Sequence, residues 1–337
     1  MNQQNSKEVA IIGTGFSGMG AAIALDRAGI SDFILLEKSG EIGGTWRDNR
    51  YPGACCDVPS QLYSFSFELN PGWTRRFAPA EEILAYEHHV MEKYGLADRT
   101  RCGFEVASAV YGDEGWVLTS TQGDTVTAKY LISAIGALHI PHKPELPGLR
   151  QFHGKVMHSA EWDHDYDYAG KKVLVVGSAA SAVQIIPQVA KSAAHVDIMQ
   201  RTPNWFLPRK DRKVSGLEHW LFRKLPFVQR LARWRQYCFN DFLFFPNFLV
   251  RPSMIKKFMH RWVTRHMEKG VSDPELAAKL WPEYEIGCKR LLLTDDFMPT
   301  VQRENVSLHT DGISHFTEDG LVTESGAFIA ADCVVLA

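Results

Sequence analysis

Residues 9–18, VAIIGTGFSG, join an apolar run to three glycines spaced G-x-G-x-x-G. An apolar run of this kind is typical of a buried parallel strand, and residues 19–28 predict a helix that begins directly after the last glycine. Gly13 permits a tight turn, Gly15 lets the backbone approach a pyrophosphate, and Gly18 lets the helix pack against the strand. The stretch therefore predicts the strand–turn–helix of a dinucleotide-binding fold.

The residues after this stretch support the same interpretation. The apolar run FILL at residues 33–36 predicts a second strand, and Glu37 follows it directly. A carboxylate at the end of this strand can accept hydrogen bonds from both hydroxyls of a ribose. A glycine-rich turn arising by chance is the alternative, but a strand, a helix and an acid at their expected spacings argue against it.

The same pattern occurs again in residues 173–199. The apolar run VLVV, the turn GSAASA and a helix expected over residues 183–194 follow in the same order. Pro187 is an unfavourable residue inside that helix. Ala179 and Ala182 stand where the first copy has glycines, and Ala179 crowds the approach of a phosphate. A βαβ unit that binds no ligand is therefore the alternative interpretation of this copy.

One substitution distinguishes the ligands of the two copies. Glu37 lies 24 residues after Gly13, and Arg201 lies 24 residues after Gly177. A carboxylate suits a free ribose diol, whereas a guanidinium suits the 2′-phosphate of NADP. The sequence thus predicts FAD as the cofactor of the first fold and NADPH as that of the second.

Composition excludes several other classes of protein. The 337 residues are 45% hydrophobic and 23% charged with a formal net charge of −2, so nothing indicates the clustered basic surface of a nucleic-acid-binding protein. No apolar stretch is long enough to predict a transmembrane helix. The six cysteines show neither CxxC nor CxxxxC spacing. They are interpreted as reduced thiols of a cytoplasmic protein that has neither a metal site nor the redox disulfide of a disulfide reductase.

The fold class expected is α/β, with two Rossmann-like domains and a helical insertion. The FAD-binding domain is expected over residues 1–145 and the NADPH-binding domain over residues 146–325. Residues 321–337 repeat the pattern of an earlier hairpin, residues 116–136, but stop where a glycine and a loop should follow. We therefore expect residues 326–337 to return to the FAD domain, and the chain to be truncated at its C-terminus.

Two further motifs resemble a known family. Residues 152–163, FHGKVMHSAEWD, resemble the fingerprint F-x-G-x-x-x-H-x-x-x-W-[PD] of type I Baeyer–Villiger monooxygenases. Residues 43–57, GGTWRDNRYPGACCD, match a second motif of that family, [AG]-G-x-W-x-x-x-x-[FY]-P-[GM]-x-x-x-D. The related flavin-containing monooxygenases usually carry Tyr or Phe where Trp162 stands. Residues 200–205 and 288–290 also resemble segments of the family.

The resemblance implies a reaction. NADPH would reduce FAD, and reduced flavin would react with O2 to give a C4a-peroxyflavin. Its attack on the carbonyl of a hydrophobic ketone would yield an ester or a lactone, with the protein supplying orientation and electrostatics. The alternatives are N- or S-oxygenation by the same cofactors, and an inactive fragment that binds nucleotide poorly. Neither the ketone nor the oligomeric state follows from the sequence.

The resemblance also assigns residues. Arg290 matches the arginine that stabilises the peroxide anion, and Asp57 matches the aspartate that orients it; a surface cation and a turn residue are their respective alternatives. His158 and Trp162 are interpreted as packing residues of the linker between the domains. The cofactor-binding residues expected are Gly13, Gly15, Phe16, Ser17, Gly18, Glu37, Lys38, Gly44, Thr45, Trp46, Asp57, Val58, Tyr63, Val106, Gly177, Ser178, Ser181, Ala182, Gln184, Arg201, Thr202 and Lys289.

An insert at about residues 205–284 interrupts the second fold. It is rich in aromatic and basic residues, and its spacings predict amphipathic helices. By resemblance to the family, these helices would help to form the substrate pocket. The alternatives are a helical cap on the sheet and a helix at a membrane surface, because basic residues flank apolar ones.

Overall fold

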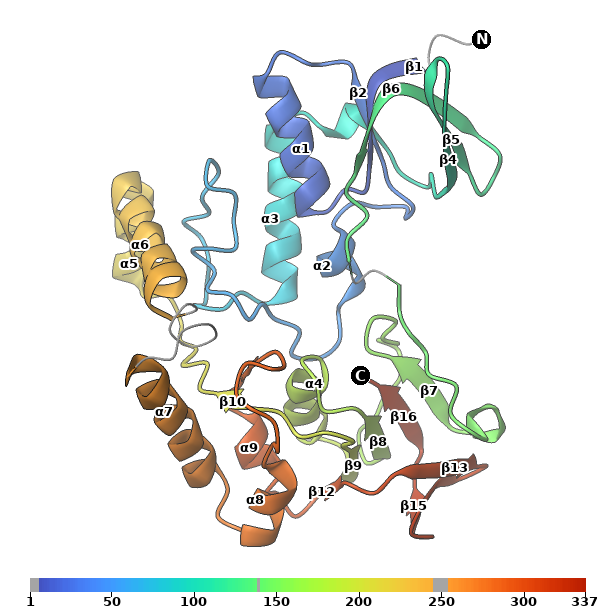
Figure 1. Cartoon of the computed structure of the whole chain (residues 1–337), viewed down its shortest axis with the longest axis vertical. Helices are drawn as coiled ribbons and strands as arrows, with labels where there is room; N and C mark the ends of the chain where they lie inside the picture. Colours follow the sequence, from blue (N-terminus) through green and yellow to red (C-terminus); the bar gives the residue numbers. More distant parts are fainter. Residues whose placement is uncertain (1–5, 138–139, 245–253) are drawn as a thin grey trace. The chain divides into compact units, whose positions relative to one another are not determined.

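The strand before the first glycine motif, β1 (Ser6–Ile12), lies inside a six-stranded sheet of order β3-β2-β1-β6-β5-β4 (Figure 1). The structure is a computed structural model that describes residues 6–137, 140–244 and 254–337. β1 pairs in parallel with β2 (Phe33–Leu36) and β6 (Thr125–Ser133), and α1 (Phe16–Arg27) follows the turn. The other elements of this unit are α2 (Gly44–Asp48), α3 (Ala80–Lys93), η2 (Ala97–Arg99), β3 (Thr100–Arg101), β4 (Val106–Gly112) and β5 (Gly115–Ser120).

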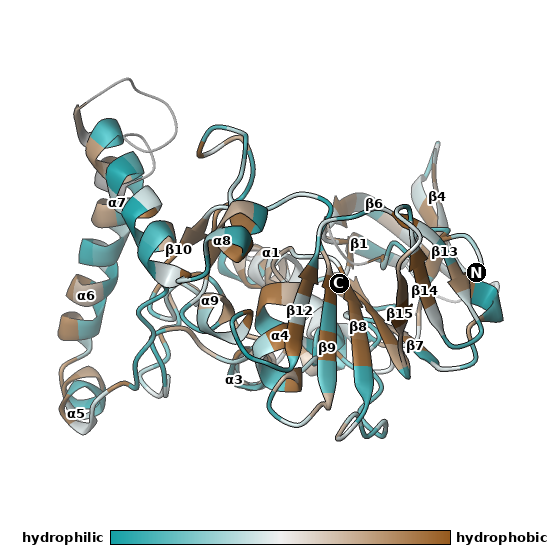
Figure 2. Cartoon of the chain, turned by 90° about the horizontal axis from the view of Figure 1, so that it is seen from below, coloured by the Kyte–Doolittle hydropathy of each residue, from teal (hydrophilic) through white to brown (hydrophobic). Residues whose placement is uncertain are grey.

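A second unit repeats this plan around a five-stranded parallel sheet of order β12-β9-β8-β16-β7. The motif strand β8 (Lys172–Val176) again lies between two parallel neighbours, β9 (His195–Met199) and β16 (Cys333–Leu336). Figure 2 shows hydrophobic positions along β8, β9 and β12, as expected of strands buried on both faces. The outer strands of the sheet are β7 (Lys155–His158) and β12 (Val306–His309). The predicted α/β class with two Rossmann-like folds is confirmed.

The position of β16 corrects one expectation. Residues 326–337 belong to the second unit and not to the first, because β16 pairs with β7 and β8. The chain reaches it through a three-stranded antiparallel sheet, β13 (Ile313–Thr317), β14 (Gly320–Thr323) and β15 (Phe328–Ala330). β16 is therefore the counterpart of β6, which also lies beside its motif strand. The repeated hairpin pattern ends in each unit with a strand that pairs in parallel with the motif strand.

The expected domain boundary near residue 145 is also corrected. The first unit comprises Met1–Asn49 and Ala80–Pro141, and the second comprises Arg50–Pro79 and His142–Ala337. Backbone hydrogen bonds join the segment Arg50–Pro79 to the second unit, from Arg76 N to Arg212 O (2.9 Å) and from Val214 N to Thr74 O (2.8 Å). Such contacts between distant parts of the chain leave no local sequence signal.

The insert of the second unit is helical, as expected. The short parallel strands β10 (Phe206–Leu207) and β11 (Leu292–Leu293) bracket it. None of the helices within residues 6–137, 140–244 and 254–337 is long and apolar enough to cross a bilayer. The helices between the two strands are α5 (Gly216–Lys224), α6 (Pro226–Cys238), η4 (Phe239–Phe244), α7 (Met254–Gly270) and α8 (Pro274–Leu280). The remaining short helices of the unit are η3 (Leu149–Gln151) and α9 (Phe297–Thr300).

The helix of the second motif differs from its prediction. α4 spans Ala182–Val189, whereas the sequence predicts residues 183–194. It contains Pro187, which lacks the N–H that would bond one turn back. Its apolar residues are buried under the sheet together with Val173 and Val175, so tertiary packing keeps a short helix in spite of the proline.

Candidate functional site

Gly13 and Gly18 of the first motif have the structural roles that the sequence predicts. Gly13 has φ +101°, and a Cβ there would lie 2.4 Å from the carbonyl oxygen of Ala134, at the end of β6. A Cβ on Gly18 would lie 1.9 Å from the oxygen of Gly13. A Cβ on Gly15 would meet no heavy atom within 4 Å. Gly13 and Gly18 are thus required by the fold, whereas the space at Gly15 is open to a ligand.

The first helix presents an N-terminus to this open space. α1 begins at Phe16 without a side-chain cap on Gly15, and the positive end of its dipole favours an anion in this space. Gly44, the first residue of α2, is also close, because a Cβ on it would lie 3.5 Å from Gly15 Cα. Backbone at two helix N-termini therefore surrounds Gly15, an arrangement that fits a pyrophosphate.

The carboxylate of Glu37 is buried and already bonded within the protein. It accepts hydrogen bonds from the Thr14 hydroxyl, from the backbone N–H groups of Thr14 (3.2 Å) and Ser39 (3.0 Å), and from Arg47 (2.9 Å). Burial alone raises the pKa of Glu37, but these hydrogen bonds and the Arg47 charge outweigh burial and lower it. Four bonds take up about the full acceptor capacity of a carboxylate, so a ribose would have to displace one of these donors.

The other residues expected to bind FAD are divided between the two units. Phe16 stacks on Tyr86 of α3 with ring centroids 5.9 Å apart. Ser17, Lys38 and Thr45 are exposed, and Gly44, Trp46 and Val106 are half-buried. Asp57, Val58 and Tyr63 belong to the second unit.

The turn of the second motif is built on Gly177, which has φ +129°. A Cβ there would lie 1.9 Å from the oxygen of Ala337, the residue directly after β16. Gly13 of the first unit has the same kind of contact, with the oxygen of Ala134. The Ser178 hydroxyl donates to Thr202 O (3.3 Å), which joins the turn to the loop after β9. Ser181 occupies the N-cap position of α4 without a side-chain capping hydrogen bond, and Ala182 is the first residue of the helix. The turn is intact although α4 begins later after its glycine than α1 does.

The two cations expected near NADPH differ in their surroundings. Arg201 follows β9, is exposed, and forms no ion pair or hydrogen bond with the residues that the structure describes. An uncommitted guanidinium at this position is suited to a phosphate. Lys289 is exposed, and its Nζ lies 4.9 Å from the centroid of the Tyr284 ring.

Gln184 of α4 holds the Arg50–Pro79 segment in place. Its side-chain oxygen accepts from the Tyr51 hydroxyl (3.0 Å) and from Cys55 N (3.2 Å), and its nitrogen donates to Cys55 O (3.2 Å). Gly53 is as tightly packed, because a Cβ there would lie 2.7 Å from Gln184 O. Gln184, expected to bind cofactor, thus fixes the part of this segment that directly precedes Asp57.

Arg290 and Asp57 form an ion pair across 233 positions of the chain. Arg290 lies in the loop before β11, and Asp57 in the segment that Gln184 holds. The Arg290 side chain is mostly exposed, whereas that of Asp57 is half-buried. The structure therefore brings together the two residues that the resemblance identifies as catalytic.

A cavity of about 740 Å³ adjoins this pair, with Asp57 in its wall. Its volume is within the range of sites for small molecules. Its charged or polar lining residues include Arg76, Arg209, Lys210 and Asp241. Its apolar lining is formed by Val58, Pro59, Leu62, Phe77, Leu207, Pro208, Phe239, Phe258, Met259, Trp262 and Leu293.

Sequence patterns do not reveal three residues of these sites. Arg47 is buried against Glu37, and Arg209 donates to Cys55 Sγ (2.8 Å) in the wall of the cavity. Glu87 of α3 is buried close to Gly43, at the start of α2. Arg47 has one sequence signal, since it is a charged residue within the family motif of residues 43–57. Glu87 and Arg209 have no sequence signal.

Comparison with known proteins places the chain in a family. The sequence pattern of the pyridine nucleotide-disulphide oxidoreductases matches residues 10–225. The chain belongs to this family. In this family member no disulfide links any of the six cysteines, and Cys55 and Cys56 are adjacent free thiols. The chain therefore shares the two dinucleotide-binding folds of this family, but its cysteines form no redox disulfide.

Individual relatives of this family member support the resemblance found in its motifs. It is 43% identical over 335 residues to a Baeyer–Villiger monooxygenase of Pseudomonas aeruginosa. The alignment covers 97% of the chain and 62% of that protein, so the chain spans less than two thirds of this relative's length. The similarity to Baeyer–Villiger monooxygenases expected from residues 43–57 and 152–163 is confirmed.

Solved structures agree with this result. A cyclohexanone monooxygenase from Rhodococcus sp. Phi1 bound to NADP+ matches with a TM-score of 0.87 and 27% identity, covering 99% of this chain and 70% of that one. A complex of OTEMO with FAD and NADP matches with a TM-score of 0.86 and 27% identity, covering 98% and 71%.

Proposed function

We propose that the protein is an FAD- and NADPH-dependent monooxygenase that inserts one oxygen atom next to a ketone carbonyl. The observation that carries this proposal is the Arg290–Asp57 ion pair beside the largely apolar cavity. Bound FAD, once reduced by NADPH, would supply the chemistry with O2. The substrate proposed is a hydrophobic carbonyl compound, since aliphatic and aromatic side chains form most of the cavity wall.

The residues of each motif fit the cofactor assigned to them. The open space at Gly15, at the N-terminus of α1, would hold the pyrophosphate of FAD. The uncommitted Arg201 would bind the 2′-phosphate of NADPH in a two-point contact. The structural match to a complex of OTEMO with FAD and NADP supports this assignment. We also propose a cytoplasmic location, supported by six free thiols.

Arg290 would stabilise negative charge that develops on oxygen, because a guanidinium remains charged at any physiological pH. Asp57 would orient Arg290 through their ion pair. The hydrogen bonds of Gln184 to Tyr51 and Cys55 would fix the position of Asp57. The apolar cavity wall would exclude water from the reacting centre.

Replacing Arg290 tests this proposal. We expect Arg290→Ala to lower the yield of ester or lactone by about 100-fold or more, as loss of one charge-stabilising donor does elsewhere. Consumption of NADPH should continue with release of hydrogen peroxide, because hydride transfer does not need this charge. Arg290→Lys is the matched control and should retain part of the product. Normal ester formation by Arg290→Ala, or wild-type protein that oxygenates thioethers but no ketone, would contradict the proposal.

A further inference from the structure

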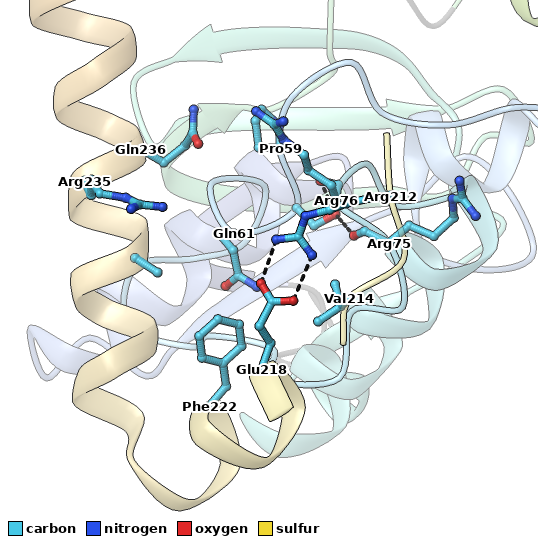
Figure 3. A pocket seen from close by; sticks show the side chains of 12 residues that line it. Pro59, Gln61, Arg75, Arg76, Arg212, Val214, Glu218, Phe222, Arg235 and Gln236 are labelled. Atoms are coloured by element: carbon cyan, nitrogen blue, oxygen red, sulfur yellow. Dashed lines mark hydrogen bonds and ion pairs between the residues drawn. The ribbon is translucent and has the colours of Figure 1, made fainter. Parts of the chain in front are cut away.

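Helix α6 has its polar and apolar faces reversed relative to an ordinary surface helix. Its inward face carries Gln229, only 3% exposed, whose amide donates to Gln61 Oε1 (2.9 Å) and to Asn70 O (2.7 Å). Arg233, on the same face, donates to the carbonyl oxygens of Gln61 (2.7 Å) and Leu62 (3.0 Å). Figure 3 shows Arg235 and Gln236 also extending from α6 toward the pocket beneath it. Polar groups therefore attach this helix to its own unit.

The apolar stripe of α6 faces outward. Phe227, Leu231 and Trp234 follow the i, i+4, i+7 spacing of one helix face and are 64%, 58% and 62% exposed. The preceding helix, α5, packs beside α6 and adds two exposed apolar residues one turn apart, Leu217 and Trp220. Figure 2 shows α5 and α6 projecting away from the five-stranded sheet of their unit. An apolar surface built from five large side chains is typical of a binding surface.

The charges around this apolar surface are of one sign. α5 and α6 carry five basic residues and one acidic residue, Glu218, which a two-point pair with Arg212 neutralises (2.8 and 2.7 Å). Within the part of the chain that the structure describes, Arg223, Lys224 and Arg230 are exposed and have no ion pair. This local excess of positive charge contrasts with the net charge of −2 of the whole chain.

We propose that α5 and α6 form a docking surface for a membrane leaflet that contains anionic lipid. Phe227, Leu231, Trp220 and Trp234 enter the boundary between headgroups and acyl chains, a depth at which tryptophan is favoured. The flanking cations contact the lipid phosphates. A second copy of the chain fits this surface less well, because a twofold contact would place the cations of one copy against those of the other. The surface holds the cavity of the second unit near a source of hydrophobic compounds.

The proposal is tested by vesicle flotation of the purified protein. The wild type should float with vesicles of phosphatidylcholine containing one third phosphatidylglycerol, and only weakly with pure phosphatidylcholine. Phe227→Ser, Leu231→Ser and Trp234→Ser, made together, should weaken binding by about tenfold or more. Arg223→Glu with Arg230→Glu should have a similar effect on the anionic vesicles alone. These side chains are exposed, so circular dichroism should remain that of the wild type.

A matched control lies in the other unit. Val110 and Tyr111 of β4 are as exposed as the stripe on α6, so Val110→Ser with Tyr111→Ser should leave vesicle binding unchanged. Equal binding to both vesicle types, or anionic-vesicle binding that the triple variant retains, would overturn the proposal. So would light scattering that shows a dimer which the triple variant abolishes, because a second copy would then be the occupant. The result does not depend on FAD, NADPH or monooxygenase activity.

Discussion

Among single residues, Glu87 has the least favourable surroundings. The residue is 1% exposed, and neither carboxyl oxygen has a partner at regular hydrogen-bond geometry among the described residues. Burial raises the pKa of Glu87 to about 9, and the Arg47 charge and the Phe16 N–H oppose this only in part. The group therefore keeps its proton at pH 7 in the folded protein, whereas the unfolded chain loses it near the ordinary value of 4.5.

This difference predicts an unusual pH dependence. Because the folded state binds the proton more tightly, the free energy of unfolding should fall as pH rises from about 4.5 towards 9. Glu87→Gln should flatten that fall in thermal unfolding curves recorded between these limits. Glu87→Leu should raise the free energy of unfolding at pH 8 by about 1–3 kcal/mol, the cost of an unpaired buried polar group. The exposed Glu92 of the same helix is the control, and Glu92→Gln should change neither quantity. A wild-type stability that is flat over this range would contradict the assignment.

Single residues also show where sequence analysis stops. Spacing from the glycine motif identifies Glu37 and Arg201, because the turn fixes where the next strand ends. It does not reveal that Arg47 neutralises Glu37, since the path of the intervening loop decides which side chain reaches it. Asp57 and Arg290 were predicted only by resemblance; no local pattern relates two residues that are 233 positions apart.

At the scale of elements, the turn between β1 and α1 separates two roles of glycine. Gly15 has an ordinary φ of −77° and open space at its Cβ position, whereas Gly13 has φ +101° and contacts Ala134. Gly15→Ala should therefore unfold in urea within about 0.5 kcal/mol of the wild type. Its added methyl should lower FAD affinity at least tenfold in a fluorescence titration, because it occupies the approach of the pyrophosphate.

Gly13→Ala is the matched control for the turn. It should lose about 1–3 kcal/mol of stability, because alanine is strained at this φ and its Cβ meets the oxygen of Ala134. If Gly15→Ala binds FAD as tightly as the wild type, the ligand lies elsewhere.

Elements were predicted well where local rules decide them. β2 has the bounds that its apolar run predicts, and α1 begins at Phe16, three residues before the prediction. α4 ends five residues earlier than predicted, at Val189. β16 was assigned to the wrong sheet, because an apolar strand carries no signal of which parallel neighbours it will join.

At the scale of the whole molecule, two copies of one plan differ in the residues that we propose to select their ligands. In each unit the residue directly after a strand has its carbonyl oxygen against the first motif glycine, Ala134 at Gly13 and Ala337 at Gly177. The copies differ in the charged residue that follows their second strand, which is Glu37 in the first and Arg201 in the second. They also differ in the helical insert, which belongs to the second unit. The segment Arg50–Pro79 is the exception to this plan, since it joins the second unit through contacts that sequence patterns cannot anticipate.

Two separate sites predict two independent effects on stability. A ligand that binds only the folded protein at 100 times its Kd raises the free energy of unfolding by about 2.7 kcal/mol. FAD and NADP+ should each raise the thermal unfolding temperature of the wild type. Gly15→Ala should lose only the FAD effect, because its new methyl lies in the first unit. Arg201→Ala should lose only the NADP+ effect and should no longer distinguish NADP+ from NAD+, because the guanidinium recognises the 2′-phosphate. If Arg201→Ala removed the FAD effect instead, the glutamate and the arginine would not select the ligands of the two folds, and the assignment of the cofactors would have to be reversed.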